Sequence, residues 1–206
     1  MSTKQFAVTW DYRCPFARNA HEHLLAGIAG GADWDVTFLP FSLDQVHVPE
    51  GEPPIWDRPG DSTGLWALQA GALVRDRHPD EFLAVHRSLF AFRHDEAGSL
   101  KDHDAVTGVL AKHLGADAAA DVAAAVDAGE AMALVRDAHE QGVSESSVWG
   151  VPTFIADGQA VFVRLMDRNA GETDDERQHG RVTIDRVLHL LGWPELNEFK
   201  HTSIPR

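Results

Sequence analysis

The chain has one cysteine, Cys14, which stands where a β-prone run meets a predicted helix. The run covers residues 6–10 (FAVTW), and Pro15 suits the first turn of a helix. A helix N-terminus presents unpaired N–H groups and a partial positive charge, which favour a thiolate over a thiol. We therefore expect Cys14 to be a nucleophile, with Arg13 and Arg18 adding to the positive field around it.

The alternative for Cys14 is structural, because free cysteines are often small buried hydrophobic residues. The neighbouring Pro15 and the strand-to-helix context favour the reactive interpretation. One cysteine cannot form an internal disulfide, so this thiol is either free or a partner for an external one. The chemistry that remains open to it is attack on a disulfide or on an electrophile.

The elements around Cys14 follow the order β-α-β. After the strand at 6–10, apolar or small residues recur at helical spacing from 16 to 28, and Gly30-Gly31 ends the helix. Residues 34–43 (WDVTFLPFSL) alternate as a second strand that Pro40 interrupts. A loop rich in proline, glycine and acidic residues follows at 48–61.

A helical region separates this first half from a second strand-rich half. Residues 62–144 carry about five segments with helix-period apolar positions, and no internal repeat is present. A predicted β-hairpin covers 153–155 and 160–165, with a turn at Asp157-Gly158. A last helix is predicted at 181–191.

This pattern predicts an α/β thioredoxin-like fold with a helical insertion domain. The predicted thioredoxin-like domain is discontinuous, covering 1–61 and 145–206, and the insertion covers 62–144. The segment Cys14-Pro15-Phe16-Ala17 resembles the Cys-x-x-Cys motif of that fold, and Val151-Pro152-Thr153 resembles the cis-proline segment that faces it. The chain as a whole resembles the DsbA-like group. That group includes disulfide oxidoreductases, kappa-class glutathione transferases and 2-hydroxychromene-2-carboxylate isomerases.

A shorter similarity concerns the C-terminal part. Residues 161–168 (VFVRLMDR) and 198–202 (EFKHT) are similar to segments of actinobacterial mycothiol-dependent reductases. This second resemblance covers only those short stretches, whereas the DsbA-like one covers nearly the whole chain. It adds mycothiol to glutathione as a small thiol that the protein could use.

The sequence departs from the pattern of the dithiol enzymes in this group at Ala17, where those enzymes have a second, resolving cysteine. A two-cysteine cycle within one chain is therefore impossible. The resemblance then implies a monothiol route in which a low-molecular-weight thiol, mycothiol or glutathione, resolves the mixed disulfide. We expect this thiol to be a co-substrate, with no tightly bound cofactor.

The resemblance also implies which residues bind substrate and thiol. If the bond before Pro152 is cis, the Val151 backbone faces Cys14 and can pair with an extended ligand. Aromatic residues near the two motifs could form an apolar wall. The expected binding residues are Tyr12, Arg13, Pro15, Phe16, Ala17, Trp149, Val151 and Pro152. For Trp10 and Phe16 the alternative is a place in the core.

Two other functions remain open. Loss of the second cysteine suits a thiol transferase or isomerase of the kappa or hydroxychromene type, in which a bound thiol attacks the substrate and the enzyme forms no covalent bond. The third possibility is a redox-inactive binding module, because one fold hosts many functions. The sequence has no GxGxxG, GxxxxGK[ST] or GxSxG motif that would indicate nucleotide binding or α/β-hydrolase chemistry.

Charge and composition restrict the partners. The chain has 32 acidic and 18 basic residues, a formal charge of −14, which argues against binding to nucleic-acid phosphates. No basic segment precedes an apolar run near the start, and no run reaches about 18 apolar residues, so we expect a cytoplasmic protein without membrane contact. A homodimer is possible, with the tail 193–206 covering a neighbour.

The twelve histidines do not indicate a metal site. His21 and His23 are two positions apart on a predicted helix and cannot point to one ligand from the same side. No Cys/His cluster accompanies the others. We expect no metal, and we interpret the histidines as single residues on helix surfaces.

Overall fold

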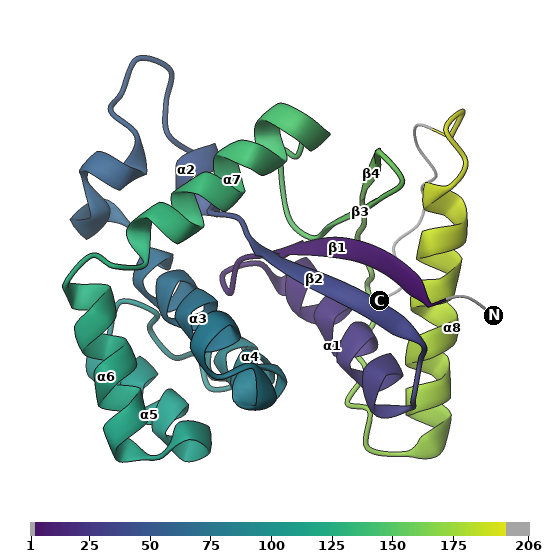
Figure 1. Cartoon of the computed structure of the whole chain (residues 1–206), viewed down its shortest axis with the longest axis horizontal. Helices are drawn as coiled ribbons and strands as arrows, with labels where there is room; N and C mark the ends of the chain where they lie inside the picture. Colours follow the sequence, from purple (N-terminus) through teal and green to yellow (C-terminus); the bar gives the residue numbers. More distant parts are fainter. Residues whose placement is uncertain (1–2, 197–206) are drawn as a thin grey trace.

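The computed structural model describes residues 3–196 and contains a four-stranded sheet in the order β2-β1-β3-β4 (Figure 1). β1 and β2 are parallel, whereas β3 is antiparallel to both β1 and β4. The register pairs Trp10 with Pro40 and Val8 with Phe154. The strands are β1 (Lys4–Trp10), β2 (Trp34–Pro40), β3 (Thr153–Ala156) and β4 (Gln159–Phe162).

Helices α1 (Pro15–Ala29) and α8 (Asp174–Leu191) pack closely against each other beside the sheet. The approach is tight at Gly180, where a Cβ atom would lie 2.6 Å from the backbone oxygen of His23. α8 begins seven residues earlier than the predicted 181, because Thr173 and Glu176 form a capping box at its start. The sequence pattern missed this polar first turn because it contains no apolar residue.

Five long helices, α3 to α7, follow the short α2 between β2 and β3 and lie to one side of the sheet in Figure 1. Of these, α3 and α7 contact β2. The predicted fold class, a thioredoxin-like fold with a helical insertion, is confirmed. The helices are α3 (Leu65–Arg77), α4 (Pro79–His94), α5 (His103–Leu114), α6 (Ala116–Asp127) and α7 (Met132–Ser146), preceded by the short α2 (Leu43–Val46) and two 3₁₀ turns at 55–57 and 59–61.

One carboxylate, that of Asp44 in α2, binds the segment 62–64 through which the chain enters the insertion. Its oxygens accept hydrogen bonds from the backbone N–H groups of Thr63 and Gly64 and from the Ser62 hydroxyl. Gly64 is the N-cap of α3 and has no side chain with which to cap it. The side chains of Asp44 and Ser62, which lie outside α3, therefore accept the hydrogen bonds of backbone N–H groups at its start.

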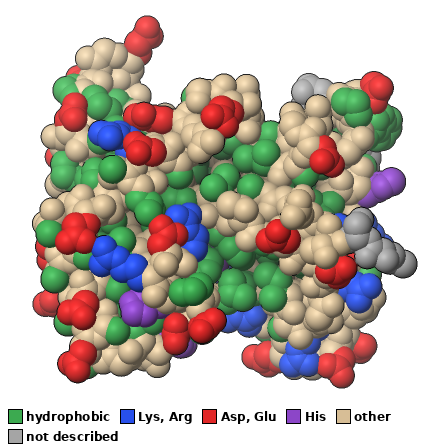
Figure 2. Space-filling model, viewed as in Figure 1, with side chains coloured by type: hydrophobic (Ala, Val, Ile, Leu, Met, Phe, Trp, Pro, Cys, Tyr) green, Lys and Arg blue, Asp and Glu red, His purple; other side chains and the backbone are tan. Residues whose placement is uncertain are grey.

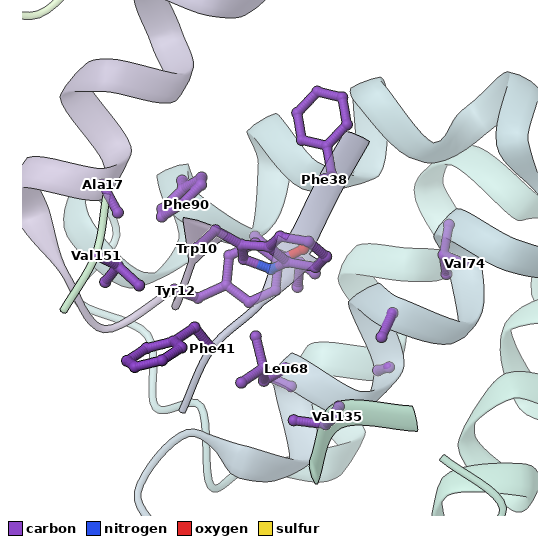
Figure 3. Close-up of a cluster of buried hydrophobic side chains, with 14 of the residues drawn as sticks. Trp10, Tyr12, Ala17, Phe38, Phe41, Leu68, Val74, Phe90, Val135 and Val151 are labelled. Atoms are coloured by element: carbon purple, nitrogen blue, oxygen red, sulfur yellow. The ribbon is translucent and has the colours of Figure 1, made fainter. Parts of the chain in front are cut away.

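One hydrophobic core continues from the sheet into the insertion. Figure 3 shows Trp10, the last residue of β1, and Tyr12, two residues beyond it, near Phe90 of α4 and Leu68 of α3. Trp10, Tyr12 and Phe154 are fully buried. On the face drawn in Figure 2, hydrophobic side chains gather along the middle, and acidic side chains lie both among them and around the edge. None of the helices within residues 3–196 is long and apolar enough to cross a membrane.

The interpretation of the histidines as surface residues is wrong for four of them, since His21, His23, His86 and His139 are buried. Two of these form a hydrogen-bonded chain with Tyr12 in the core. The Tyr12 hydroxyl is 3.0 Å from His86 Nδ1, His86 Nε2 is 2.9 Å from His21 Nδ1, and His21 Nε2 is 3.1 Å from the Thr9 carbonyl oxygen.

We call this series of hydrogen bonds the Tyr12–His86–His21 chain. Only one placement of the protons gives each of its three hydrogen bonds a donor and an acceptor. The Thr9 carbonyl can only accept, so His21 Nε2 carries a proton and His21 Nδ1 accepts one from His86. His86 Nδ1 then accepts from the Tyr12 hydroxyl. Both imidazoles are neutral, and burial lowers the pKa of His21 to about 4 and that of His86 well below its usual value.

The burial of His139 in α7 should make the stability of the protein depend on pH. It stacks on Phe41 at 4.0 Å and lies 5.5 Å from the Trp56 ring, and burial lowers its pKa to about 4. As the pH falls below about 6.5, the unfolded chain takes up a proton that the folded chain does not, so the folded state loses stability.

We expect His139→Leu to remove this loss. Urea unfolding of the variant and the natural protein at about pH 7.5 and pH 5 should show the free energy of unfolding of the variant rising relative to the natural protein by about 2 kcal/mol at the lower pH. In the difference between the two proteins, the contributions of all other titrating groups to the pH dependence of the free energy of unfolding cancel. A difference that does not change with pH would show that His139 titrates normally in the folded state.

Candidate active site at the N-terminus of helix α1

Cys14 is the N-cap residue of α1, as its position before Pro15 predicts. Its Sγ atom accepts a hydrogen bond from the backbone N–H of Ala17 at 3.4 Å. The residue is only 8% exposed. The cap is consistent with the tendency of helix N-termini to bind electron-rich atoms.

The second predicted motif lies directly against this thiol. The bond between Val151 and Pro152 is cis, as the resemblance implies. The Cys14 thiol donates a hydrogen bond to the Val151 carbonyl oxygen at 3.3 Å. The two motifs that the sequence separates therefore meet at one place, and both Val151 and Pro152 are buried there.

The expectation that this environment favours a thiolate is wrong for the resting protein. Burial raises the pKa of the Cys14 thiol, and the backbone N–H groups of Ala17 and Phe16 lower it by less. Neither basic residue expected to help is free to do so. Arg13 forms an ion pair with Asp44, and Arg18 pairs with Glu22 and Asp95.

Asp11 holds the turn that carries the cysteine. One carboxylate oxygen accepts from the Arg13 N–H and the other from the Leu43 N–H, both at 2.8 Å, while the Asp11 carbonyl accepts from the Cys14 N–H. Burial raises the pKa of Asp11 to about 6. Its negative charge also raises the pKa of Cys14, so it positions the cysteine at a cost to thiolate formation.

The predicted aromatic wall divides into buried and accessible residues. Tyr12 and Trp10 are fully buried and cannot line a site open to substrate, so the placement of Tyr12 in the wall is a mistake. Phe16 is half-buried and Trp149 is 62% exposed. The Trp149 ring lies 4.3 Å from that of Phe162 at the end of β4.

The sequence reasoning missed two residues beside this site, Phe162 and Arg164. The Arg164 guanidinium lies 5.3 Å from the Phe16 ring centroid and 5.4 Å from that of Phe162. Its positive charge lowers the pKa of Cys14. The signal was present, because 161–168 was singled out for its similarity to mycothiol-dependent reductases, but no single residue in it was assigned a role.

No group of three or more His, Cys, Asp or Glu side chains within the described residues is arranged to hold a metal ion. The predicted similarity at 198–202 and most of the tail 193–206 lie outside the described residues.

The sequence matches the family described as "DSBA-like thioredoxin domain" over residues 7–169. This range contains both motifs, Cys14 to Ala17 and Val151 to Thr153. A comparison with curated proteins finds no match.

Several solved structures share the fold at low identity. The cytosolic disulfide reductase DsbM from Pseudomonas aeruginosa, solved with GSH, is 13% identical, with a TM-score of 0.60 over 90% of this chain and 99% of that one. BdbD from Bacillus subtilis is 15% identical, with a TM-score of 0.60 over 90% and 87%. A 2-hydroxychromene-2-carboxylate isomerase is 12% identical, with a TM-score of 0.59 over 91% and 98%.

Proposed function

Because the chain belongs to the DSBA-like thioredoxin family, we propose that it is a single-cysteine thiol oxidoreductase that uses a low-molecular-weight thiol. The observation that carries the proposal is the contact of Cys14 with the Val151 carbonyl, 3.3 Å from Sγ, at the N-terminus of α1. A residue used only to fill the core would not need to meet the Val151-Pro152 segment in this way. Ala17, in place of a resolving cysteine, makes the external thiol necessary.

The reaction proceeds by two exchanges. The Cys14 thiolate attacks one sulfur of a disulfide substrate, forms a new S–S bond, and releases the other half as a thiolate. A small thiolate then attacks the mixed disulfide, which returns Cys14 as a thiolate and releases a second disulfide. One such turn consumes one small thiol and leaves the other half of the substrate in a mixed disulfide with it. A second small thiol then exchanges with that mixed disulfide, so that full reduction releases both halves of the substrate as thiols and joins two small thiols in one disulfide.

The resting thiol must first lose its proton. In the resting state this proton is donated to the Val151 carbonyl, and burial disfavours the charge that its loss creates. An extended ligand whose N–H donates to the Val151 carbonyl would replace the thiol at that acceptor. The Ala17 N–H, which already points to Sγ, would remain to stabilise the thiolate.

The pH dependence of the reaction tests this account. Since the pKa of Cys14 is raised, we expect the rate of mixed-disulfide formation with excess glutathione disulfide to keep rising by about tenfold per pH unit from about pH 7 to pH 9. Mass spectrometry of the intact protein measures the adduct directly. Alkylation of Cys14 by a neutral reagent should follow the same profile.

Two outcomes would contradict the account. A rate that levels off well below pH 8 would show that the thiolate is stabilised in the resting protein, against the burial described here. No mixed disulfide at any pH, with the chain folded, would overturn the oxidoreductase proposal and leave two functions, a thiol transferase or isomerase and a redox-inactive binding module.

A second candidate is a thiol transferase or isomerase, and the protonated Cys14 favours it. A thiol that donates to a carbonyl and has no resolving partner is suited to hydrogen-bond a bound thiol rather than to attack. Such an enzyme would react a bound small thiol with an electrophile at this place and form no covalent bond itself. It would show turnover without any mixed disulfide on Cys14.

We propose that the protein works in a reducing compartment, as a monothiol cycle requires a pool of reduced small thiol. One structural neighbour, DsbM, is described as cytosolic and was solved with GSH. The single cysteine supports the same assignment, because the chain gains no internal disulfide from an oxidising environment.

A further inference from the structure

Arg164 is a basic side chain held against aromatic rings beside the thiol. Its guanidinium lies 5.3 Å from the ring centroid of Phe16, two residues after Cys14, and 5.4 Å from that of Phe162. Phe162 in turn contacts the exposed Trp149. A guanidinium that lies over the faces of aromatic rings makes no hydrogen bond to them through its ring contact, so its N–H groups stay available for an oxyanion.

The backbone on both sides of Arg164 is fixed to the two motifs of the site. The Val163 N–H donates to the carbonyl oxygen of Pro152 at 3.0 Å. On the other side, Asn19 in α1 donates to the Leu165 carbonyl at 2.9 Å. Arg164 therefore projects from a segment whose position relative to Cys14 is set by the Pro152 loop and by helix α1.

Charge makes this residue unusual in the chain. The protein has a formal charge of −14, and such a surface repels anionic ligands. Arg13, Arg18 and Arg168 near the site are all paired with carboxylates. Arg164 forms no ion pair or hydrogen bond with any residue between 3 and 196, and it is exposed.

We propose that Arg164 binds a carboxylate of the small thiol or disulfide that reacts at Cys14. This inference rests on the proposed oxidoreductase function and specifies its co-substrate as an anionic thiol such as glutathione. Phe16 and Phe162 hold the guanidinium in place and supply apolar contact to the part of the ligand between its sulfur and its carboxylate.

Three small disulfides of different charge provide the test: glutathione disulfide, which is anionic, 2-hydroxyethyl disulfide, which is neutral, and cystamine, which is cationic. Rates of mixed-disulfide formation would be measured by intact mass at about pH 8 and low salt, where charge effects are least screened. The quantity compared between variants is the rate of mixed-disulfide formation with the anionic disulfide divided by the rate with the neutral disulfide. This ratio cancels any change in the pKa of Cys14 that a variant causes.

We expect Arg164→Gln to lower this ratio by about five- to tenfold, the loss of one charge-assisted hydrogen bond at an exposed site. Arg164→Lys should retain part of the ratio, because it keeps the charge but not the planar fork. The matched control is Lys112→Gln on α5, which removes the same charge from the insertion and should leave the ratio unchanged. The cationic disulfide should gain slightly in Arg164→Gln.

The results separate the two proposals. If the natural protein reacts with all three disulfides and Arg164→Gln leaves the ratio unchanged, carboxylate binding is overturned and the oxidoreductase proposal stands. An equal fall in Lys112→Gln would also overturn it, since the effect would then be one of net charge. If the natural protein forms no mixed disulfide with any of the three, both proposals fail.

Discussion

Replacing Cys14 by serine is expected to lower the rate of thiol–disulfide exchange by at least about a thousandfold, because the nucleophile itself is removed. The variant should nevertheless fold. Serine is a preferred N-cap residue, so its oxygen can accept from the Ala17 N–H and its hydroxyl can donate to the Val151 carbonyl, as the thiol does. The loss of activity would therefore report on chemistry and not on stability.

The measurement is turnover of a small disulfide with glutathione as reductant, with unfolding curves recorded for both proteins. Cys14→Ala is the matched control for the cap, since alanine has neither donor nor acceptor and should lower stability by about 1 kcal/mol. A serine variant that retains substantial turnover would contradict covalent exchange. It would favour the transferase or isomerase function, in which a hydroxyl can still hydrogen-bond the attacking thiol.

Replacing His86 by leucine is expected to destabilise the protein by about 2–5 kcal/mol, although no surface residue changes. His86 is fully buried at the middle of the Tyr12–His86–His21 chain. Its loss leaves the Tyr12 hydroxyl without an acceptor and His21 Nδ1 without a donor, each at a cost of about 1–3 kcal/mol. Leucine has a similar volume, so the cavity contribution is small.

Tyr12→Phe provides the matched control for this prediction. It removes the terminal hydroxyl and leaves one orphaned acceptor, His86 Nδ1, so the cost should be smaller, about 1–2 kcal/mol. The double variant should lose less free energy of unfolding than the two single variants lose together. The Tyr12 hydroxyl, one of the groups left without a partner by His86→Leu, is absent from it. Chemical unfolding measures all three, and additive costs would argue against a chain that acts as a unit.

Much of the fold was predictable from local patterns. Strand β1, helix α1 and the β3–β4 hairpin follow from apolar periodicity and from turn residues such as Gly30 and Gly158. The predicted boundary between 144 and 145 falls in the last turn of α7, which runs to Ser146. Helix ends of this kind depend on capping by residues outside the apolar pattern.

The geometry of the candidate site was predictable where local motifs define it, and not where tertiary contacts do. The meeting of Cys14 with Val151 could be predicted because prolines mark both segments. Tyr12 was misplaced because the end of β1 turns its side chain toward His86 and Phe90, and this direction depends on the position of α4. The raised pKa of Cys14 was missed for a similar reason, since burial depends on every element packed around the thiol.

The shared cap at the start of α3 limits how the protein can be divided. A fragment that contains only the helical region, 62–144, would keep Ser62 and Gly64 at the start of α3 but would lose Asp44, which belongs to the other half. A thioredoxin half without the insertion would keep Asp44 and its ion pair with Arg13. It would lose Ser62 and Thr63, which donate hydrogen bonds to the same Asp44 carboxylate. The two parts are therefore not interchangeable modules, and a graft of this insertion onto a related scaffold would have to carry α2 with it.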